Sequence, residues 1–104
     1  MPFPTQFSRY SFDEADVEMH RRLFVIYERE CKRLMALDLL LPAFDYVLKC
    51  SHTFNVLDAR GALGVAQRTD YIARVRALAK AAAEAYIKLR QTKHHPLLKP
   101  DPAK

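Results

Sequence analysis

Three stretches of the chain repeat apolar residues at the spacing of an α-helix. The first begins at Ser11, the second at Pro42, and the third runs from about Val65 to Thr92. In each stretch the apolar residues return every three or four positions, so they share one face. The first stretch shows this as a seven-residue rhythm at Val17, His20, Phe24, Tyr27, Cys31, Leu34 and Met35. No segment has the two-residue period of a strand, so the pattern predicts an all-α fold: a three-helix antiparallel bundle with short turns.

The two ends of the chain differ from these stretches. Pro2 and Pro4 disfavour helix, and we expect residues 1–10 to be an extended lead-in. Ser11 and Glu14 then have the S-x-x-E spacing of a capping box, which predicts the start of the first helix. Three prolines in the last eleven residues predict a disordered tail over residues 94–104. The helical domain is therefore expected to span residues 11–93.

Polar residues fall on the apolar side of the second helix. Ser51, Asn55 and Asp58 share a face with apolar side chains. These are Phe44, Val47, Leu48, Cys50, Phe54 and Leu57. A buried carboxylate needs a partner, and Arg68 lies on the apolar stripe of the third helix. We therefore expect an Asp58–Arg68 ion pair inside the core, with Ser51 and Asn55 completing its hydrogen bonds. The alternative is that the second helix ends near His52 and that these polar residues line a turn.

Charge is spread unevenly along the chain. The net charge of +5 combines −2 over residues 1–58 with +7 over residues 59–104. Such asymmetry suggests an anionic partner for the C-terminal half, although a solvated helix face is at least as good an explanation. The candidate contacts with RNA or another partner are Arg74, Arg76, Lys80, Lys88 and Arg90. Tyr71 and Tyr86 fall on the core side of the third helix, which argues against a stacking platform for single-stranded RNA.

Cysteine usage and hydropathy bear on the compartment. Cys31 and Cys50 lie on apolar helical faces without a pairing framework, which predicts reduced, core-packed thiols in a cytoplasmic protein. The N-terminus lacks the basic and apolar regions of a signal peptide. No apolar run approaches the ~20 residues of a membrane helix, so we expect no membrane partner.

We expect no catalytic, cofactor-binding or metal site in this chain. Ser51, His52 and Asp58 supply the residue types of a hydrolytic triad, but neighbours on one helix cannot point at each other as a triad requires. His94 and His95 are adjacent in the tail, and a metal would need further ligands from elsewhere. The sequence also lacks a Cys-x-x-Cys pair and a glycine-rich phosphate loop.

A long ordered part of the chain resembles a known family. The segment SHTFNVLDARG, followed by RTDYIARVRALAKAAAEAY, is similar to the C-terminal helical region of the alpha subunit of bacterial heterotetrameric glycyl-tRNA synthetase. YERECKRLM and LPAFDYVLK agree as well, so the similarity runs from about Ser8 to Gln91. The family usually has serine, glutamate and a basic residue where Gly64, Gln67 and Asp70 stand. The residues that keep the family's pattern include Ser51, His52, Asn55, Asp58, Arg60 and Arg68.

The resemblance implies a role in a glycine–tRNA ligase that stops short of its chemistry. In that family the alpha subunit activates glycine with ATP and Mg²⁺, its catalytic core is an antiparallel sheet, and the beta subunit supplies most tRNA recognition. This chain has no sequence resembling that sheet, so we expect it to be a part of the subunit that is inactive alone. The implied partners are the catalytic domain of the same subunit and the beta subunit, with tRNA as a further candidate. The alternative is a stand-alone basic helical module that binds RNA or protein.

Overall fold

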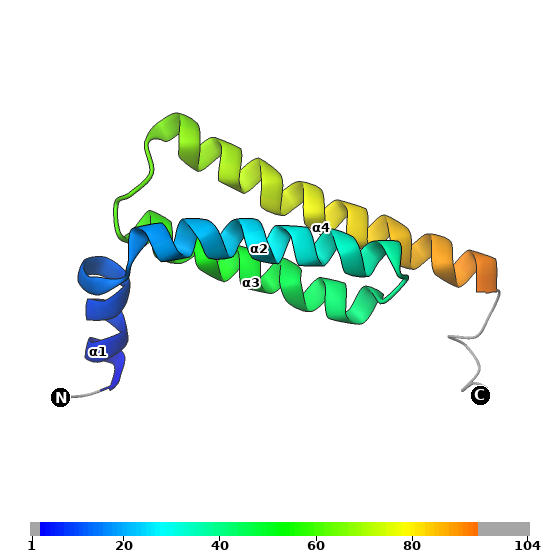
Figure 1. Cartoon of the computed structure of the whole chain (residues 1–104), viewed down its shortest axis with the longest axis horizontal. Helices are drawn as coiled ribbons and strands as arrows, with labels where there is room; N and C mark the ends of the chain where they lie inside the picture. Colours follow the sequence, from blue (N-terminus) through cyan, green and yellow to red (C-terminus); the bar gives the residue numbers. More distant parts are fainter. Residues whose placement is uncertain (1–2, 94–104) are drawn as a thin grey trace.

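A computed structural model describes residues 3–93, and within that range every regular element is helical (Figure 1). The order is α1 (Phe3–Arg9), a π-helical turn η1 (Tyr10–Glu14), α2 (Val17–Ala36), α3 (Leu40–Ala59) and α4 (Val65–Lys93). The prediction of an all-α fold is confirmed. The expected disordered tail over residues 94–104 lies outside the described residues.

The three long helices pack side by side and alternate in direction (Figure 1). Their apolar faces meet in one core, because each helix repeats apolar residues at helical spacing. The buried residues of this core are Phe24, Cys31, Leu34, Ala43, Val47, Cys50, Phe54, Leu78 and Ala82. Both cysteines are free and buried, as the sequence predicts.

The N-terminal segment differs from the prediction. Residues 3–9 form helix α1, so the expected extended lead-in over residues 1–10 is wrong. Pro4 stands in the first turn of α1, where a missing backbone N–H breaks no helical hydrogen bond. Pro4 therefore lies within a helix and does not exclude one.

The start of α2 also lies later than expected. Asp16 is its N-cap, and the Asp16 carboxylate accepts a hydrogen bond from the Met19 backbone N–H at 2.9 Å. Ser11 and Glu14 lie in the preceding π-helical turn, so the predicted capping box is wrong. The cap of α2 is therefore Asp16 and not the predicted Ser11.

The turn between α2 and α3 is a Schellman motif. The Leu39 N–H donates to the Leu34 carbonyl at 2.9 Å, and the Asp38 N–H donates to the Met35 carbonyl at 3.0 Å. Asp38 takes the left-handed position of this motif, with φ at +60°. Glycine is the usual residue there because it has no Cβ. The tight turn places α3 antiparallel to α2.

The connection from α3 to α4 follows the sequence more closely. Gly61, just after α3, has a φ of +70°, as expected for a left-handed helix cap. The Gly64 N–H donates to the Gln67 side-chain oxygen at 3.2 Å, so Gln67 reaches back to cap α4. The first six residues of α4, Val65–Asp70, are all exposed. Helix α4 therefore stands away from α3 at this end and approaches it farther along (Figure 1).

Candidate interaction surfaces

The principal polar link between the long helices joins Glu28 of α2 to Arg74 of α4. The Arg74 guanidinium binds both carboxylate oxygens, with Nε donating to Oε2 at 3.1 Å and Nη2 to Oε1 at 2.5 Å. The two side chains are only 16% and 31% exposed, respectively. The guanidinium also lies 4.7 Å from the Phe24 ring centre and 5.3 Å from that of Tyr71. Arg74 is one of the predicted RNA or partner contacts, and in this structure its guanidinium is engaged by Glu28 within the protein.

The electrostatics of this pair follow from its geometry. Hydrogen bonding from Arg74 lowers the pKa of the Glu28 carboxyl, against the opposing effect of burial. The same hydrogen bond raises the pKa of Arg74. Both groups are therefore charged across the physiological range, and the pair is a fixed structural element, with no role in proton transfer.

The predicted pair between Asp58 and Arg68 forms at the surface. Arg68 Nε donates to Asp58 Oδ1 at 3.1 Å, and the side chains are 55% and 36% exposed for Arg68 and Asp58. Ser51 is half-buried and Asn55 is exposed. The predicted burial of this polar cluster is therefore wrong, because the first turns of α4 do not cover this part of α3.

The alternative interpretation of the same residues, a turn beginning near His52, is also excluded. Helix α3 continues without interruption to Ala59. Arg60 follows it and turns back toward the N-terminal segment, where Arg60 Nε donates to the Ala15 carbonyl at 2.9 Å. The polar residues thus lie on a continuous helix whose end is fastened to the segment before α2.

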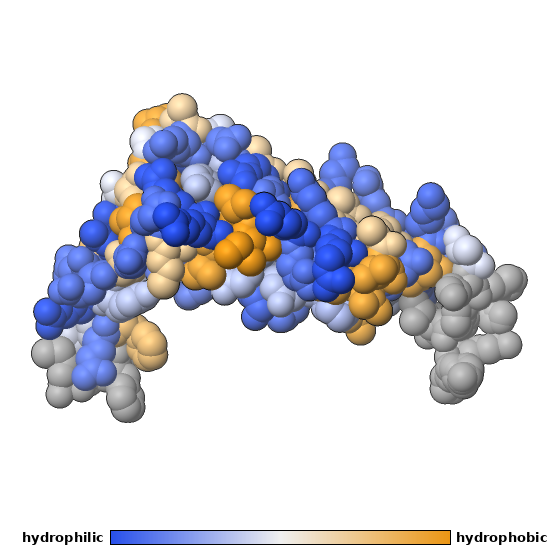
Figure 2. All heavy atoms as spheres, viewed as in Figure 1, coloured by the Kyte–Doolittle hydropathy of each residue, from blue (hydrophilic) through white to orange (hydrophobic). Residues whose placement is uncertain are grey.

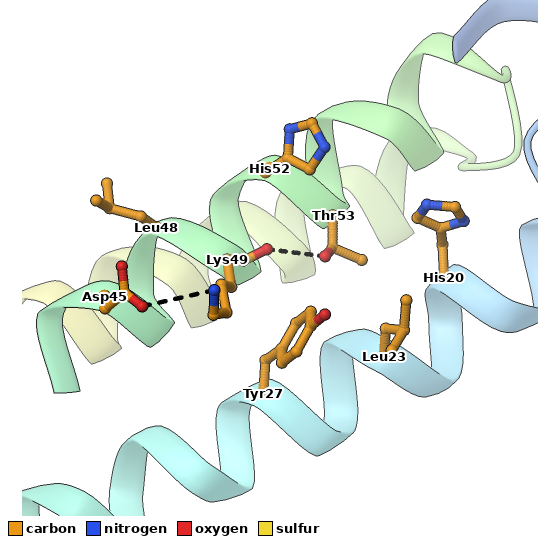
Figure 3. Close-up of a pocket in the computed structure, with 8 residues that line it drawn as sticks. All are labelled: His20, Leu23, Tyr27, Asp45, Leu48, Lys49, His52 and Thr53. Carbon is orange, nitrogen blue, oxygen red and sulfur yellow. Dashed lines mark hydrogen bonds and ion pairs between the residues drawn. The ribbon is translucent and has the colours of Figure 1, made fainter. Parts of the chain in front are cut away.

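A groove lies between α2 and α3 (Figure 3). Its volume is about 450 Å³, and none of the residues that line it belongs to α4. The lining residues of this α2–α3 groove are His20, Leu23, Tyr27, Asp45, Leu48, Lys49, His52 and Thr53. The groove is therefore open to solvent, and it is formed by α2 and α3 without α4.

Polar contacts in the α2–α3 groove are local to each helix. The buried His20 ring hydrogen-bonds through Nδ1 to the Asp16 carbonyl at 2.8 Å, which assigns the proton to Nδ1. Thr53 donates to the Lys49 carbonyl at 2.8 Å, and Lys49 pairs with Asp45 at 3.5 Å (Figure 3). Within residues 3–93, no three metal-ligating side chains gather at one place. The groove has the mixed apolar and polar lining of a contact surface.

The side chains of His52 and Asp58, two of the residues considered for a hydrolytic triad, make different contacts. His52 lines the α2–α3 groove, whereas Asp58 is held by Arg68. His94 and His95 fall outside the described residues. Between residues 3 and 93, no helix is both long and apolar enough to cross a membrane.

Four further cations of α4, namely Arg76, Lys80, Lys88 and Arg90, are exposed. Arg76, Lys80 and Lys88 follow one another along the helix surface, with the acidic Glu84 between the last two. Arg90 lies 5.9 Å from the centre of the Tyr86 ring, and Tyr86 in turn meets Phe44 edge-on. Of the five predicted contacts, Arg76, Lys80, Lys88 and Arg90 are exposed, whereas Arg74 is half-buried.

Comparison with protein families gives a match over most of the chain. The family described as glycyl-tRNA synthetase alpha subunit matches residues 3–91. This range takes in α1, α2, α3 and nearly all of α4. It also includes the Glu28–Arg74 and Asp58–Arg68 ion pairs and the α2–α3 groove. The chain belongs to the glycyl-tRNA synthetase alpha subunit family.

Proposed function

We propose that this chain is the helical assembly domain of a glycine–tRNA ligase. It packs on the catalytic domain of the same subunit or on the beta subunit, and it supports tRNA aminoacylation without performing the chemistry. Family membership supports the process, and the antiparallel three-helix bundle of α2, α3 and α4 supports the structural role. ATP, glycine and Mg²⁺ bind elsewhere in the enzyme, and the complex acts in the cytoplasm.

The observation that carries this proposal is the apolar surface on α2. Val25 and Ile26 are 42% and 53% exposed, and Met19 is 43% exposed. Val25 and Ile26 line a shallow hollow together with Glu18, Arg21 and Arg22. Ile26 also lines a second hollow, beside Arg29. Apolar side chains also break the charged surface in the space-filling view (Figure 2). Apolar residues within a charged rim are typical of protein–protein contacts.

The direct test is a calorimetric titration of this chain with purified beta subunit. We expect saturable binding by the unaltered chain and at least about tenfold weaker binding by Ile26→Asp, because a carboxylate opposes burial of the α2 surface. Ile87→Asp is the matched control, since Ile87 of α4 is 55% exposed and Ile26 is 53% exposed. Absence of binding to the beta subunit, or equal loss in both variants, contradicts this role for α2.

The exposed cations of α4 favour a second candidate, contact with tRNA. Arg76, Lys80 and Lys88 lie at the surface, where they are able to meet phosphates. The same titration made with glycine tRNA in place of the beta subunit separates the two functions. Binding that weakens steeply with added salt supports phosphate contact. Binding to the beta subunit alone supports the assembly role.

A further inference from the structure

The outward face of α2, defined by its exposed side chains from Glu18 to Arg33, has two chemically different halves. The first half exposes the apolar side chains of Met19, Val25 and Ile26. The second half exposes cations, namely Arg29, Lys32 and Arg33. Figure 2 shows an apolar patch over the middle of α2 with hydrophilic side chains around it. The face therefore combines an apolar area with a basic area on one helix.

Two cations of the outward face of α2 have no counter-charge in the protein. The carboxylates beside them are already engaged, in the pairs Glu18–Arg22 and Glu30–Arg33. Within residues 3–93, no carboxylate lies at ion-pair distance from Arg29 or Lys32. The helix dipole favours cations within the last turn, so it does not account for Arg29. The basic area is therefore available to an external anionic group.

Two hollows on this face share Ile26. The first, of about 450 Å³, is lined by Glu18, Arg21, Arg22, Val25 and Ile26. The second, of about 290 Å³, is lined by Ile26, Tyr27, Arg29, Glu30, Arg33 and Tyr46. On α2 the two sets centre on Arg22 and Arg29, which are ~10 Å apart along the axis. Side chains at positions i and i+7 of a second helix have the same separation, so one helix fits both hollows.

We propose that the outward face of α2 binds an acidic amphipathic helix of the beta subunit. The apolar side chains of that helix cover Val25 and Ile26 and enter the two hollows, and its carboxylates meet Arg29 and Lys32. Glu18 to Arg33 span about 22 Å, which is the length of a four-turn helix. This inference rests on the proposed assembly role and deepens it, because it states the chemistry of the surface that the beta subunit presents.

The composition of this face favours a protein partner over RNA. Val25 and Ile26 lie between its charged residues, and aliphatic side chains gain nothing from contact with phosphates. The Tyr46 ring is not free to stack on a base, because Lys49 Nζ lies 5.5 Å from its centre and the Tyr27 ring packs beside it. An apolar centre with unpaired cations at its edge fits an acidic protein surface.

Calorimetric titration of the full chain with purified beta subunit, repeated at several salt concentrations, tests the charge of the partner. We expect Arg29→Gln and Lys32→Gln each to raise the dissociation constant at least about threefold. Added salt should weaken binding less in the double variant than in the unaltered chain, because fewer charges are left to screen. Gln91→Glu is the matched control, since it lowers the net charge by the same single unit at an exposed position of α4, and it should leave the constant unchanged. Circular dichroism verifies that each variant keeps its helix content.

Cross-linking identifies the segment that occupies the face. Val25→Cys carrying a benzophenone label should form a photo-adduct with a helical segment of the beta subunit that has an excess of Asp and Glu. The native thiols do not take the label, because Cys31 and Cys50 are fully buried. An adduct with a segment that has no such excess overturns the proposal.

The titration separates this inference from the assembly role on which it rests. Binding to the beta subunit that does not depend on salt, or that Gln91→Glu weakens as much as Arg29→Gln and Lys32→Gln do, overturns the acidic helix and leaves the assembly role intact. Absence of binding by the unaltered chain contradicts both. If Arg29→Gln and Lys32→Gln weaken binding to glycine tRNA and leave binding to the beta subunit unchanged, the face binds RNA and the proposal is wrong.

Discussion

Two ion pairs tie α4 to the rest of the protein, and they differ in almost everything except their chemistry. Glu28–Arg74 joins α2 to α4 with two hydrogen bonds, and its side chains are 16% and 31% exposed. Asp58–Arg68 joins the end of α3 to the start of α4 with one hydrogen bond, and Asp58 and Arg68 are 36% and 55% exposed. The first also lies against the rings of Phe24 and Tyr71.

The degree of burial and the neighbouring side chains of an ion pair determine how much the pair contributes to stability. Two hydrogen bonds and contact with aromatic rings already restrict the side-chain conformation of such an arginine. Its partly buried site, with a low dielectric constant, strengthens the electrostatic attraction to the carboxylate. An exposed pair gains little, because water and salt screen it and two long side chains must be ordered. We therefore expect α4 to be fixed at its middle by Glu28–Arg74 and only weakly tethered at its start.

Removing the guanidinium of the inner pair gives the largest expected effect. Arg74→Ala should lower the free energy of unfolding by about 3 kcal/mol, because it leaves the Glu28 carboxylate largely buried without a partner. Urea denaturation followed by circular dichroism measures the loss. Arg68→Ala is the matched control, with the same change on the same helix. Equal losses in the two variants remove the distinction between the pairs.

Acid titration tests the inner pair by a second route. Arg74 lowers the pKa of the Glu28 carboxyl below its ordinary 4.5. A lowered pKa in the folded protein stabilises it above the pKa of the unfolded chain, and this stabilisation is lost as the pH falls through the folded value. Stability should thus decrease as the pH falls below the ordinary carboxyl value of 4.5, and Glu28→Gln should reduce that decrease.

The design of this titration also controls for a neighbouring carboxyl. Arg33 lowers the pKa of Glu30, a half-buried group on the same helix. Glu30 is unchanged in Glu28→Gln, so the difference between the two pH curves isolates Glu28. Parallel curves for the variant and the unaltered chain exclude a contribution from the inner pair.

Neutralising the outer pair should have the smallest effect. We expect Asp58→Asn to change the free energy of unfolding by no more than about 0.5 kcal/mol, because the pair is exposed and the amide still accepts a hydrogen bond from Arg68. Thermal unfolding at low and high salt measures it. A loss comparable with that of Arg74→Ala indicates that the start of α4 is held more firmly than its exposure suggests.

Hydrophobic spacing was enough to predict the three long helices, because each buries a face that repeats at 3.6 residues. The first sixteen residues were misread for a local reason. Proline is compatible with a first helical turn, and both Ser11 and Asp16 are residue types that cap helices, of which Asp16 is used. Spacing along one helix cannot choose between such neighbours.

The ion pairs show where the sequence alone falls short. The Asp58–Arg68 pairing was foreseeable from residues that share the core side of adjacent helices. The exposure of this pair depends on the distance between α3 and the start of α4. That distance cannot be predicted from the spacing of residues within either helix. Glu28–Arg74 was missed, although both residues flank apolar seams, at four after Phe24 and three after Tyr71. The available signal was an acidic residue beside the apolar face of one helix and a basic residue beside the apolar face of another, which together predict an ion pair between the two helices.

The left-handed residue in the turn between α2 and α3 has a consequence for engineering the domain. Asp38 adopts a φ of +60° that glycine accommodates with less strain. Its side chain is exposed, so an exchange to glycine disturbs no packed neighbour. We therefore expect Asp38→Gly to raise the thermal stability of the α2–α3 hairpin. The site is remote from α1 and η1 (Figure 1).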